Sequence, residues 1–296
     1  MIKVLTEDLF EDFKQYCLTY RKELDDSFLY DEDIDAFEIG NDNPTYLLYK
    51  GNELEGVCSI MQDEYHLRGG KARVRIFHCR NDRQEDYETL LDKTFPLDPR
   101  VERVVLFIPS ENLVTNAIAE KLGFFIERYS YAMVRIDKEP NEYLFSDGYE
   151  LTDMVIGRDE ADYLHVRNTA FSTIRGSETP QTIDQVKEFM KPGKILEGGA
   201  KILRYKGEPV GVIRMEHEND QGKDYSFVAP LAILPGYQGK GLGSNLLRAG
   251  IQVGVDNGYK DCMLTVNVEN EGALKLYLKE GFETISKVIC YHLKVQ

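Results

Sequence analysis

Short apolar runs alternate with longer amphipathic segments along the C-terminal half of the chain, as is typical of an α/β fold. The runs that predict strands lie at 200–205, 209–216, 225–234, 262–268 and 284–295. The segments with helical spacing lie at 159–171, 182–190, from 242 onward and at 270–280. With a further strand from Glu150, the expected order is β-α-α-β-β-β-α-β-α-β.

A glycine-rich loop follows the strand expected at 225–234 and opens the next helix. From Leu231 to Ser244 the chain reads LAILPGYQGKGLGS. Its glycines leave backbone amides uncovered, and the free N–H groups of the helix that starts near Leu242 point the same way. The loop therefore predicts an anion site, and a cofactor with a pyrophosphate group fits it.

Spacing separates the phosphate loops that compete for this stretch. A Walker loop needs lysine after its second glycine, but Leu242 follows Gly241. The dinucleotide-binding fingerprint Gly-x-Gly-x-x-Gly does not fit either, because its third glycine would fall on Ser244 if it began at Gly239 and on Leu246 if it began at Gly241. The spacing Gln/Arg-x-x-Gly-x-Gly/Ala fits at Gln238, Gly241 and Gly243. It resembles the acyl-CoA loop of the GNAT superfamily of N-acyltransferases, although an ordinary glycine-rich turn is the alternative for the loop alone.

A second motif lies about 30 residues further along. Asn270 to Phe282 resembles the other GNAT signature, Asn-x-x-Ala-x-x-Leu-Tyr-x-x-x-Gly-Phe, and predicts a helix that ends at a glycine and returns as a strand. Because the two signatures occur in the family's order, the C-terminal half is identified as a GNAT domain. The resemblance implies a mixed central sheet flanked by helices, and acetyl-CoA (coenzyme A) as the acyl donor.

The resemblance also implies a set of cofactor-binding residues. The pantetheine arm is expected along Leu231 to Ile233, where Pro230 helps to open a gap beside the strand. The residues expected at the phosphates are Gln238, Gly239, Lys240, Gly241, Leu242, Gly243 and Ser244. Asn270 is expected to cap its helix and to contact the cofactor.

Tyr277 is the candidate catalytic acid. It lies seven residues after Asn270, which is two helical turns and therefore the same face. A phenol with a pKa near 10 can protonate a departing thiolate, although packing in the core is its alternative role. For the general base, Glu216 is the candidate, with His217 and Glu218 beside it. An amine that arrives deprotonated, or a chain of water molecules, would make a dedicated base unnecessary.

The two halves of the chain resemble one another when the sequence is shifted by 158 residues without a gap. We therefore expect two tandem GNAT-like folds, a degenerate domain at 1–140 and a catalytic acyl-CoA-binding domain at 149–296. In the first copy, the positions of Gln238, Gly241, Gly243 and Tyr277 hold Arg80, Arg83, Glu85 and Ala119. These substitutions predict that the first copy neither binds acyl-CoA nor catalyses. The first copy could complete the substrate cleft, form a homodimer surface or stabilise the C-terminal copy.

Composition excludes several classes of protein. The net charge is −15, of which −13 falls in residues 1–148 and −2 in 149–296. With no basic stripe, nucleic acid is disfavoured as a partner. The five cysteines show no zinc-ligand spacing, and neither a signal peptide nor a membrane span is evident, so we expect a cytoplasmic protein with no metal and no membrane partner. The densest acidic stretch, Glu23 to Asp42, is either a solvated surface or a rim that attracts a cationic substrate.

Together these features predict an acyl-CoA-dependent N-acetyltransferase that acts on a primary amine of a small molecule or an exposed protein amine. A cationic acceptor fits best, and an aminoglycoside-like antibiotic, a polyamine, an amino-acid derivative and a protein amine all remain open. The alternative is a non-catalytic acyl-CoA-binding or regulatory module. The presence of Tyr277 beside an intact loop favours the enzyme, because a binding module has no need of the phenol.

Overall fold

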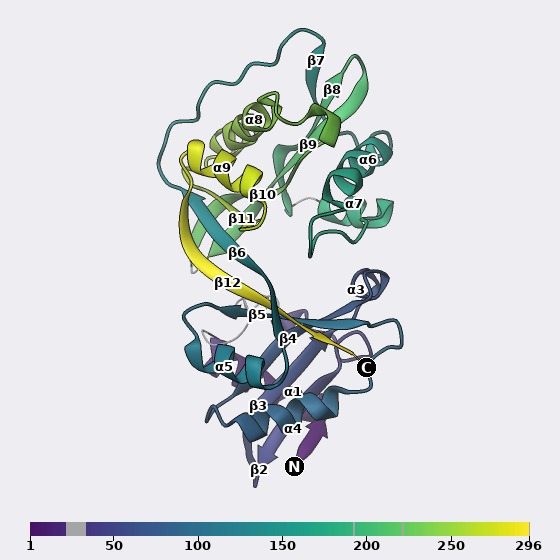
Figure 1. Ribbon diagram of the computed structural model, residues 1–296, viewed down its shortest axis with the longest axis vertical. Coiled ribbons are helices and arrows are strands. Elements are labelled where there is room, and N and C mark those ends of the chain that lie inside the picture. The colour runs from purple at the N-terminus through teal and green to yellow at the C-terminus, as the bar shows by residue number, and fades with distance from the viewer. Residues whose placement is uncertain (22–33, 192, 221, 296) are drawn as a thin grey trace. The chain divides into compact units, whose positions relative to one another are not determined.

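The computed structural model describes residues 1–21, 34–191, 193–220 and 222–295. The chain forms two compact units. Unit 1 comprises Met1–Tyr129 and Val288–Gln296, and unit 2 comprises Ser130–Lys287. Each unit is a mixed β-sheet flanked by helices, which confirms the expected α/β class (Figure 1).

Unit 2 has the order of elements that the sequence predicts. Its elements are β7 (Tyr149–Asp153), α6 (Glu160–Phe171), α7 (Ile183–Phe189), β8 (Ile195–Tyr205), β9 (Glu208–Asp220), β10 (Lys223–Ile233), α8 (Leu242–Asp256), β11 (Cys262–Asn267) and α9 (Glu271–Lys279), followed by the start of β12 (Glu283–Lys294). The predicted helices begin or end within one residue of the observed ones, because caps and periodicity are local signals.

Two helix layers cover the sheet of unit 2. β10 pairs in parallel with β11 and antiparallel with β9. Successive residues of β9 point to opposite faces, so Ile213 joins the core under α8 and α9 whereas Val212 joins the core under α6 and α7. The C-terminal ends of β10 and β11 lie between these two layers.

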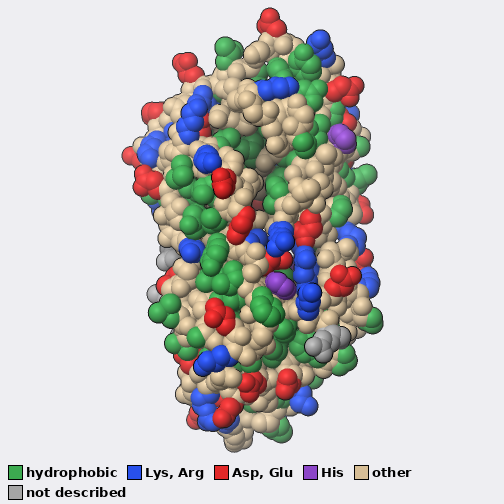
Figure 2. Space-filling model, in the orientation of Figure 1, with side chains coloured by type: hydrophobic (Ala, Val, Ile, Leu, Met, Phe, Trp, Pro, Cys, Tyr) green, Lys and Arg blue, Asp and Glu red, His purple; other side chains and the backbone are tan. Residues whose placement is uncertain are grey.

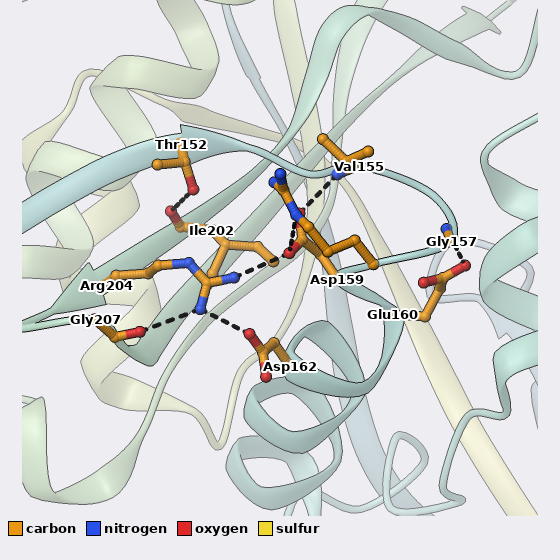
Figure 3. Close-up of polar contacts among 10 residues, drawn as sticks. Thr152, Val155, Gly157, Asp159, Glu160, Asp162, Ile202, Arg204 and Gly207 are labelled. Atoms are coloured by element: carbon orange, nitrogen blue, oxygen red, sulfur yellow. Dashed lines mark hydrogen bonds and ion pairs between the residues drawn. The ribbon is translucent and has the colours of Figure 1, made fainter.

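A network of charges fixes the start of α6 (Figure 3). The buried Asp159 carboxylate accepts hydrogen bonds from the Val155 amide (2.8 Å) and from Arg158 Nε (2.9 Å), and Arg204 Nη2 lies 3.2 Å away. Arg204 also donates to Asp162 in the first turn of α6 (2.7 Å). Because these charges are paired, burying Asp159 is tolerated and α6 is held against β8.

Unit 1 repeats much of this plan. Its elements are β1 (Ile2–Val4), α1 (Phe10–Thr19), β2 (Thr45–Lys50), β3 (Glu53–Met61), α3 (Glu64–Arg68), β4 (Lys71–Cys79), α4 (Gln84–Thr94), β5 (Arg103–Pro109), α5 (Leu113–Lys121) and the start of β6 (Phe125–Arg135). Helix α5 begins and ends 158 residues before α9, and α4 begins 158 residues before α8. The shift found in the sequence therefore aligns equivalent helices.

Each sheet is completed by a strand from the other half of the chain. In unit 1, β5 pairs with the end of β12, from Pro109 with Val288 to Arg103 with Lys294. In unit 2, β11 pairs with the end of β6, from Asn267 with Ser130 to Cys262 with Arg135. The expected domains, 1–140 and 149–296, are each continuous in sequence. Unit 1 instead consists of two segments, and unit 2 lies between them in the sequence.

The described surface carries both signs of charge. Acidic and basic side chains are interspersed on the face shown in Figure 2. Residues 22–33, which hold most of the acidic stretch expected from Glu23 to Asp42, lie outside the described residues, and Asp35 pairs with Lys14 Nζ at 2.5 Å. No helix in the described part of the chain has the length and apolar composition needed to cross a membrane.

Candidate functional site

A cleft of about 590 Å³ opens in unit 2 between the ends of β10 and β11. The glycine loop and the start of α8 form one wall, and α9 forms the other. The expected cofactor residues that line it are Leu231, Ile233, Gln238, Gly239, Gly241, Gly243, Ser244, Asn270 and Tyr277. Segments that are far apart in sequence thus meet around one cavity.

The cleft exists because β10 separates from β11. The two strands pair only from Ser226 to Val228, opposite Cys262 to Leu264. After Val228 the register of β10 against β9 shifts, at the position of Pro230, and the strand continues to Ile233 paired with β9 alone. Since Pro230 has no N–H, it is tolerated at this irregularity. The other backbone edge of Leu231 to Ile233 faces the cleft.

The glycine loop adopts a conformation that favours glycine. Gly239 and Gly241 have φ values of +75° and +78°, and a Cβ at either position would meet no atom within 4 Å. Gly241 is the N-cap of α8 and supplies no side-chain cap, so the first amides of the helix are available to an anion. Gln238 Nε2 donates to the Ile233 carbonyl (2.9 Å), which holds the loop against the strand.

Two residues expected at the phosphates do not line the cleft. Leu242 is 5% exposed and packs in the core under α8, because the first apolar position of the helix turns inward. Lys240 Nζ donates to the Gly236 carbonyl (3.2 Å) and lies 4.9 Å from the centre of the Tyr237 ring. Gly243 acts through packing as well, since a Cβ there would lie 3.1 Å from Leu276 of α9.

Helix α9 brings Asn270 and Tyr277 to the cleft. Asn270 Oδ1 accepts a hydrogen bond from the Ala273 amide (3.2 Å) and caps the helix, as expected. Tyr277 is 8% exposed and stacks edge-on against Phe282 at 5.9 Å. It therefore combines the packing role and the cleft position that the sequence left as alternatives.

Burial raises the pKa of Tyr277 to about 12, with a smaller contribution from Cys262. The phenol is protonated at neutral pH, as a proton donor must be. Against a thiol with an ordinary pKa of about 8.5, the transfer would be uphill by about 5 kcal/mol. A thiolate in the same apolar cleft is also desolvated, which raises the pKa of its thiol. The difference between this pKa and that of Tyr277 is therefore smaller than in water.

The candidate base lies outside the cleft lining. Glu216 Oε1 is 2.7 Å from Arg214 Nε, an ion pair whose geometry is not that of a hydrogen bond. Arg214 is buried, stacks on Phe189 at 4.3 Å and is held in place on β9. In Glu218, burial and the neighbouring charge of Glu216 raise the pKa, which is the direction a general base requires. His217 Nδ1 instead contacts the Tyr259 hydroxyl (2.8 Å).

Several cleft residues were not anticipated from the sequence. The end of α6 contributes Phe171, the connection from α6 to α7 contributes Ile174 and Ser177, and β6 contributes Ser130. Asn267 Nδ2 donates to the Arg175 carbonyl (2.9 Å) and so attaches this connection to β11. Ser130 has no local signal, because it reaches the cleft only through the exchange of strands.

The start of α4 in unit 1 differs from the start of α8 in unit 2. Helix α4 has Arg83 at its N-cap with a φ of −85°, in place of the left-handed glycine of α8. Glu85 and Asp86 lie in its first turn, and Asp86 pairs with Lys50 at 2.6 Å. Carboxylates in the first turn of a helix interact with the partial positive charge of its N-terminus, which a bound phosphate would otherwise do.

Comparison with known proteins finds a family match within unit 2. Residues 168–282 match the Acetyltransferase (GNAT) family. The mycothiol acetyltransferase of Paenarthrobacter aurescens (strain TC1) is 32% identical over 46% of this chain and 43% of its own length. N-alpha-acetyltransferase MAK3 of Arabidopsis thaliana is 29% identical over 30% of this chain and 47% of its own length. The chain spans about half the length of the curated relatives it matches.

Solved structures extend the likeness to the whole chain. A GCN5-related N-acetyltransferase from Sphaerobacter thermophilus superimposes with a TM-score of 0.70 at 15% identity, covering 99% of this chain and 95% of that one. A tandem GNAT protein from the clavulanic acid biosynthesis pathway gives 0.68 at 11% identity, covering 99% and 98%. These confirm the expected tandem fold. Residues 168–282 are therefore similar to the GNAT family of acetyltransferases, and the chain has a tandem GNAT fold along its length.

Proposed function

We propose that this protein is an N-acetyltransferase that transfers the acetyl group of acetyl-CoA directly to a primary amine in the cleft of unit 2. The observation that carries the proposal is the continuity of the cleft, from the glycine loop to the free edge of β10 and on to Tyr277. This arrangement supplies, in order, an anion site, a backbone edge and a proton donor.

The donor would be held mainly by backbone groups. The amides at the start of α8, uncovered by Gly239 and Gly241, would bind the pyrophosphate. The free edge of Leu231 to Ile233 would pair with the amides of the pantetheine arm as an added strand. An amide of the same edge would stabilise the negative charge that develops on the thioester oxygen.

Tyr277 would protonate the leaving sulfur. In direct transfer, the amine nitrogen bonds to the acetyl carbon, the carbon–sulfur bond breaks, and the sulfur takes a proton as thiol. The raised pKa of Tyr277 keeps its proton available at neutral pH. The ring also closes one wall of the cleft, which limits access of water to the thioester.

Glu216 stays our candidate for the base that deprotonates the amine. A Glu216→Gln variant should lose activity at pH 7 and recover it near pH 10, where an ordinary primary amine is already neutral. The matched variant is Glu218→Gln, one position along the same face of β9. If neither variant changes the pH profile, the amine arrives deprotonated and no dedicated base acts.

The acceptor is a primary amine on a small molecule or at an exposed position of a protein. Support comes from relatives whose names specify mycothiol acetylation and N-alpha-acetylation, one on a small molecule and one on a protein. A panel of polyamines, aminoglycosides, amino-acid derivatives and peptide N-termini with acetyl-CoA, read as thiol release, tests the proposal. Release that depends on an amine supports transfer, whereas binding of coenzyme A without release from any amine would indicate a non-catalytic module.

A further inference from the structure

The segment 136–148, which joins β6 to β7 and which we call the strap, passes along α8 and α9 (Figure 1). Its hydrogen bonds include Asn141 Nδ2 to Glu280 Oε2 at the C-cap of α9 (3.1 Å), Arg248 Nη1 of α8 to the Glu142 carbonyl (3.1 Å) and the Leu144 amide to Asn245 Oδ1 of α8 (3.3 Å). The junction expected between two domains is therefore bound to the helices that form the cleft.

Glu280 links two of these contacts, because it accepts from Asn141 and also binds Arg248. It is 2% exposed and accepts two hydrogen bonds from Arg248 of α8, from Nε and from Nη2, both at 2.9 Å. Its backbone carbonyl accepts a third from Arg135 Nε of β6 (3.0 Å). Burial opposes ionisation of the carboxyl, but the hydrogen bonds from Arg248 and Asn141 outweigh it and lower the pKa of Glu280. One buried carboxylate thus joins α9, α8 and the strap.

Helix α9 packs on the core of unit 2 through one buried side chain and through the partly buried Ala273, Leu274 and Leu276. Tyr277 is the single buried side chain of this helix, and Glu280 follows it by three residues. One turn before Glu280, α9 approaches the start of α8 closely, because a Cβ on Gly243 would lie 3.1 Å from Leu276. A change in the spacing of the two helices would therefore move Tyr277 and the glycine loop relative to one another.

We infer that Glu280 is a positioning residue for the cofactor cleft, and that the strap and β6 make the first half of the chain part of that site. The inference rests on the proposed function, since it assumes that acetyl-CoA binds between α8 and α9. It also assigns a role to the first half, which supplies Ser130 to the cleft wall and Asn141 to the Glu280 network. The second half alone would lack both.

The test compares Glu280→Gln with Asn141→Ala and with the control Glu53→Gln. Gln keeps the size of Glu280 but loses its charge and one acceptor. Asn141 is exposed on the strap, so its truncation leaves the core intact. Glu53 of β3, in unit 1, pairs with Arg80 at 3.3 Å on the surface, and its side chain is 73% exposed. The control therefore makes the same chemical change where no positioning is expected.

Four quantities are measured for each variant: the dissociation constant of coenzyme A by calorimetry, kcat and the KM of the amine with saturating acetyl-CoA, and the melting temperature. For Glu280→Gln we expect the dissociation constant to rise about 10-fold and kcat to fall about 10-fold, with an unchanged KM for the amine, because small misplacements of reacting groups are costly. Asn141→Ala should change both values in the same direction but less, and Glu53→Gln should leave them within twofold.

The outcomes separate this inference from the proposed function. If the unaltered protein does not bind coenzyme A, the proposed function fails. If it binds, but Glu280→Gln and Asn141→Ala bind and turn over as it does, the inference is overturned. A lower melting temperature with unchanged affinity and kcat also overturns it, because Glu280 would then be structural alone.

Discussion

Replacing Gly241 with alanine separates the two roles of this residue, in folding and in binding. At a φ of +78°, a Cβ costs about 1–2 kcal/mol in the folded state. No further steric cost arises, because the added atom meets nothing within 4 Å. We therefore expect the melting temperature to fall by about 2–8 °C. The methyl group would stand where the backbone meets the phosphates, and losing one such charge-assisted hydrogen bond, worth about 1.5–3 kcal/mol, weakens binding about 10- to 10²-fold.

Calorimetric titration of coenzyme A, with thermal melts alongside, measures both effects. Gly236→Ala is the matched control in the same loop. Gly236 has no positive φ, its Cβ would also meet nothing within 4 Å, and it does not line the cleft. That variant should melt and bind as the unaltered protein does. If Gly241→Ala melts lower yet binds coenzyme A with full affinity, the glycine loop is a strained turn and not an anion site.

Three further changes test other parts of the account. Tyr277→Phe should lower kcat by about 10²- to 10⁴-fold with little change in cofactor affinity or melting temperature, and full turnover would return Tyr277 to packing alone. Asp159→Asn should lower the free energy of unfolding by about 2–3 kcal/mol. The hydrogen bond from Arg158 lowers the pKa of Asp159, so the carboxylate stabilises the fold fully above a pH of about 4 and loses this effect as pH falls through the lowered pKa. The free energy of unfolding of the variant should therefore depend less on pH in acid. Gly199→Ala should cost about 2–3 kcal/mol, because its Cβ would lie 2.7 Å from two backbone carbonyl oxygens that cannot move aside, and an unchanged melting temperature would contradict the packing.

The sequence predicts what depends on neighbours along the chain. The helix from Glu271 to Lys279 follows from its Asn270 cap and from the glycine after it, and both signals lie within a few residues. The left-handed glycines of the loop follow from residue type in the same way. Pro230 also indicated the irregularity of β10, since it cannot donate to a strand ladder.

Long-range pairings were beyond such reasoning. Arg135 meets Glu280 across 145 positions of sequence, and Ser130 reaches the cleft through a strand exchange that no local pattern encodes. Leu242 illustrates a different limit: a loop motif gives a position in sequence, whereas the direction of a side chain depends on the face that the helix buries.

The central claim is that one acetyl-CoA binds per chain, in the cleft of unit 2. Calorimetric titration of the full chain with coenzyme A tests it most directly, with Gly241→Glu as the variant that places a carboxylate at the anion site. The account predicts a stoichiometry of about one and no binding by the variant. Two equivalent sites per chain, or normal binding by Gly241→Glu, would contradict it.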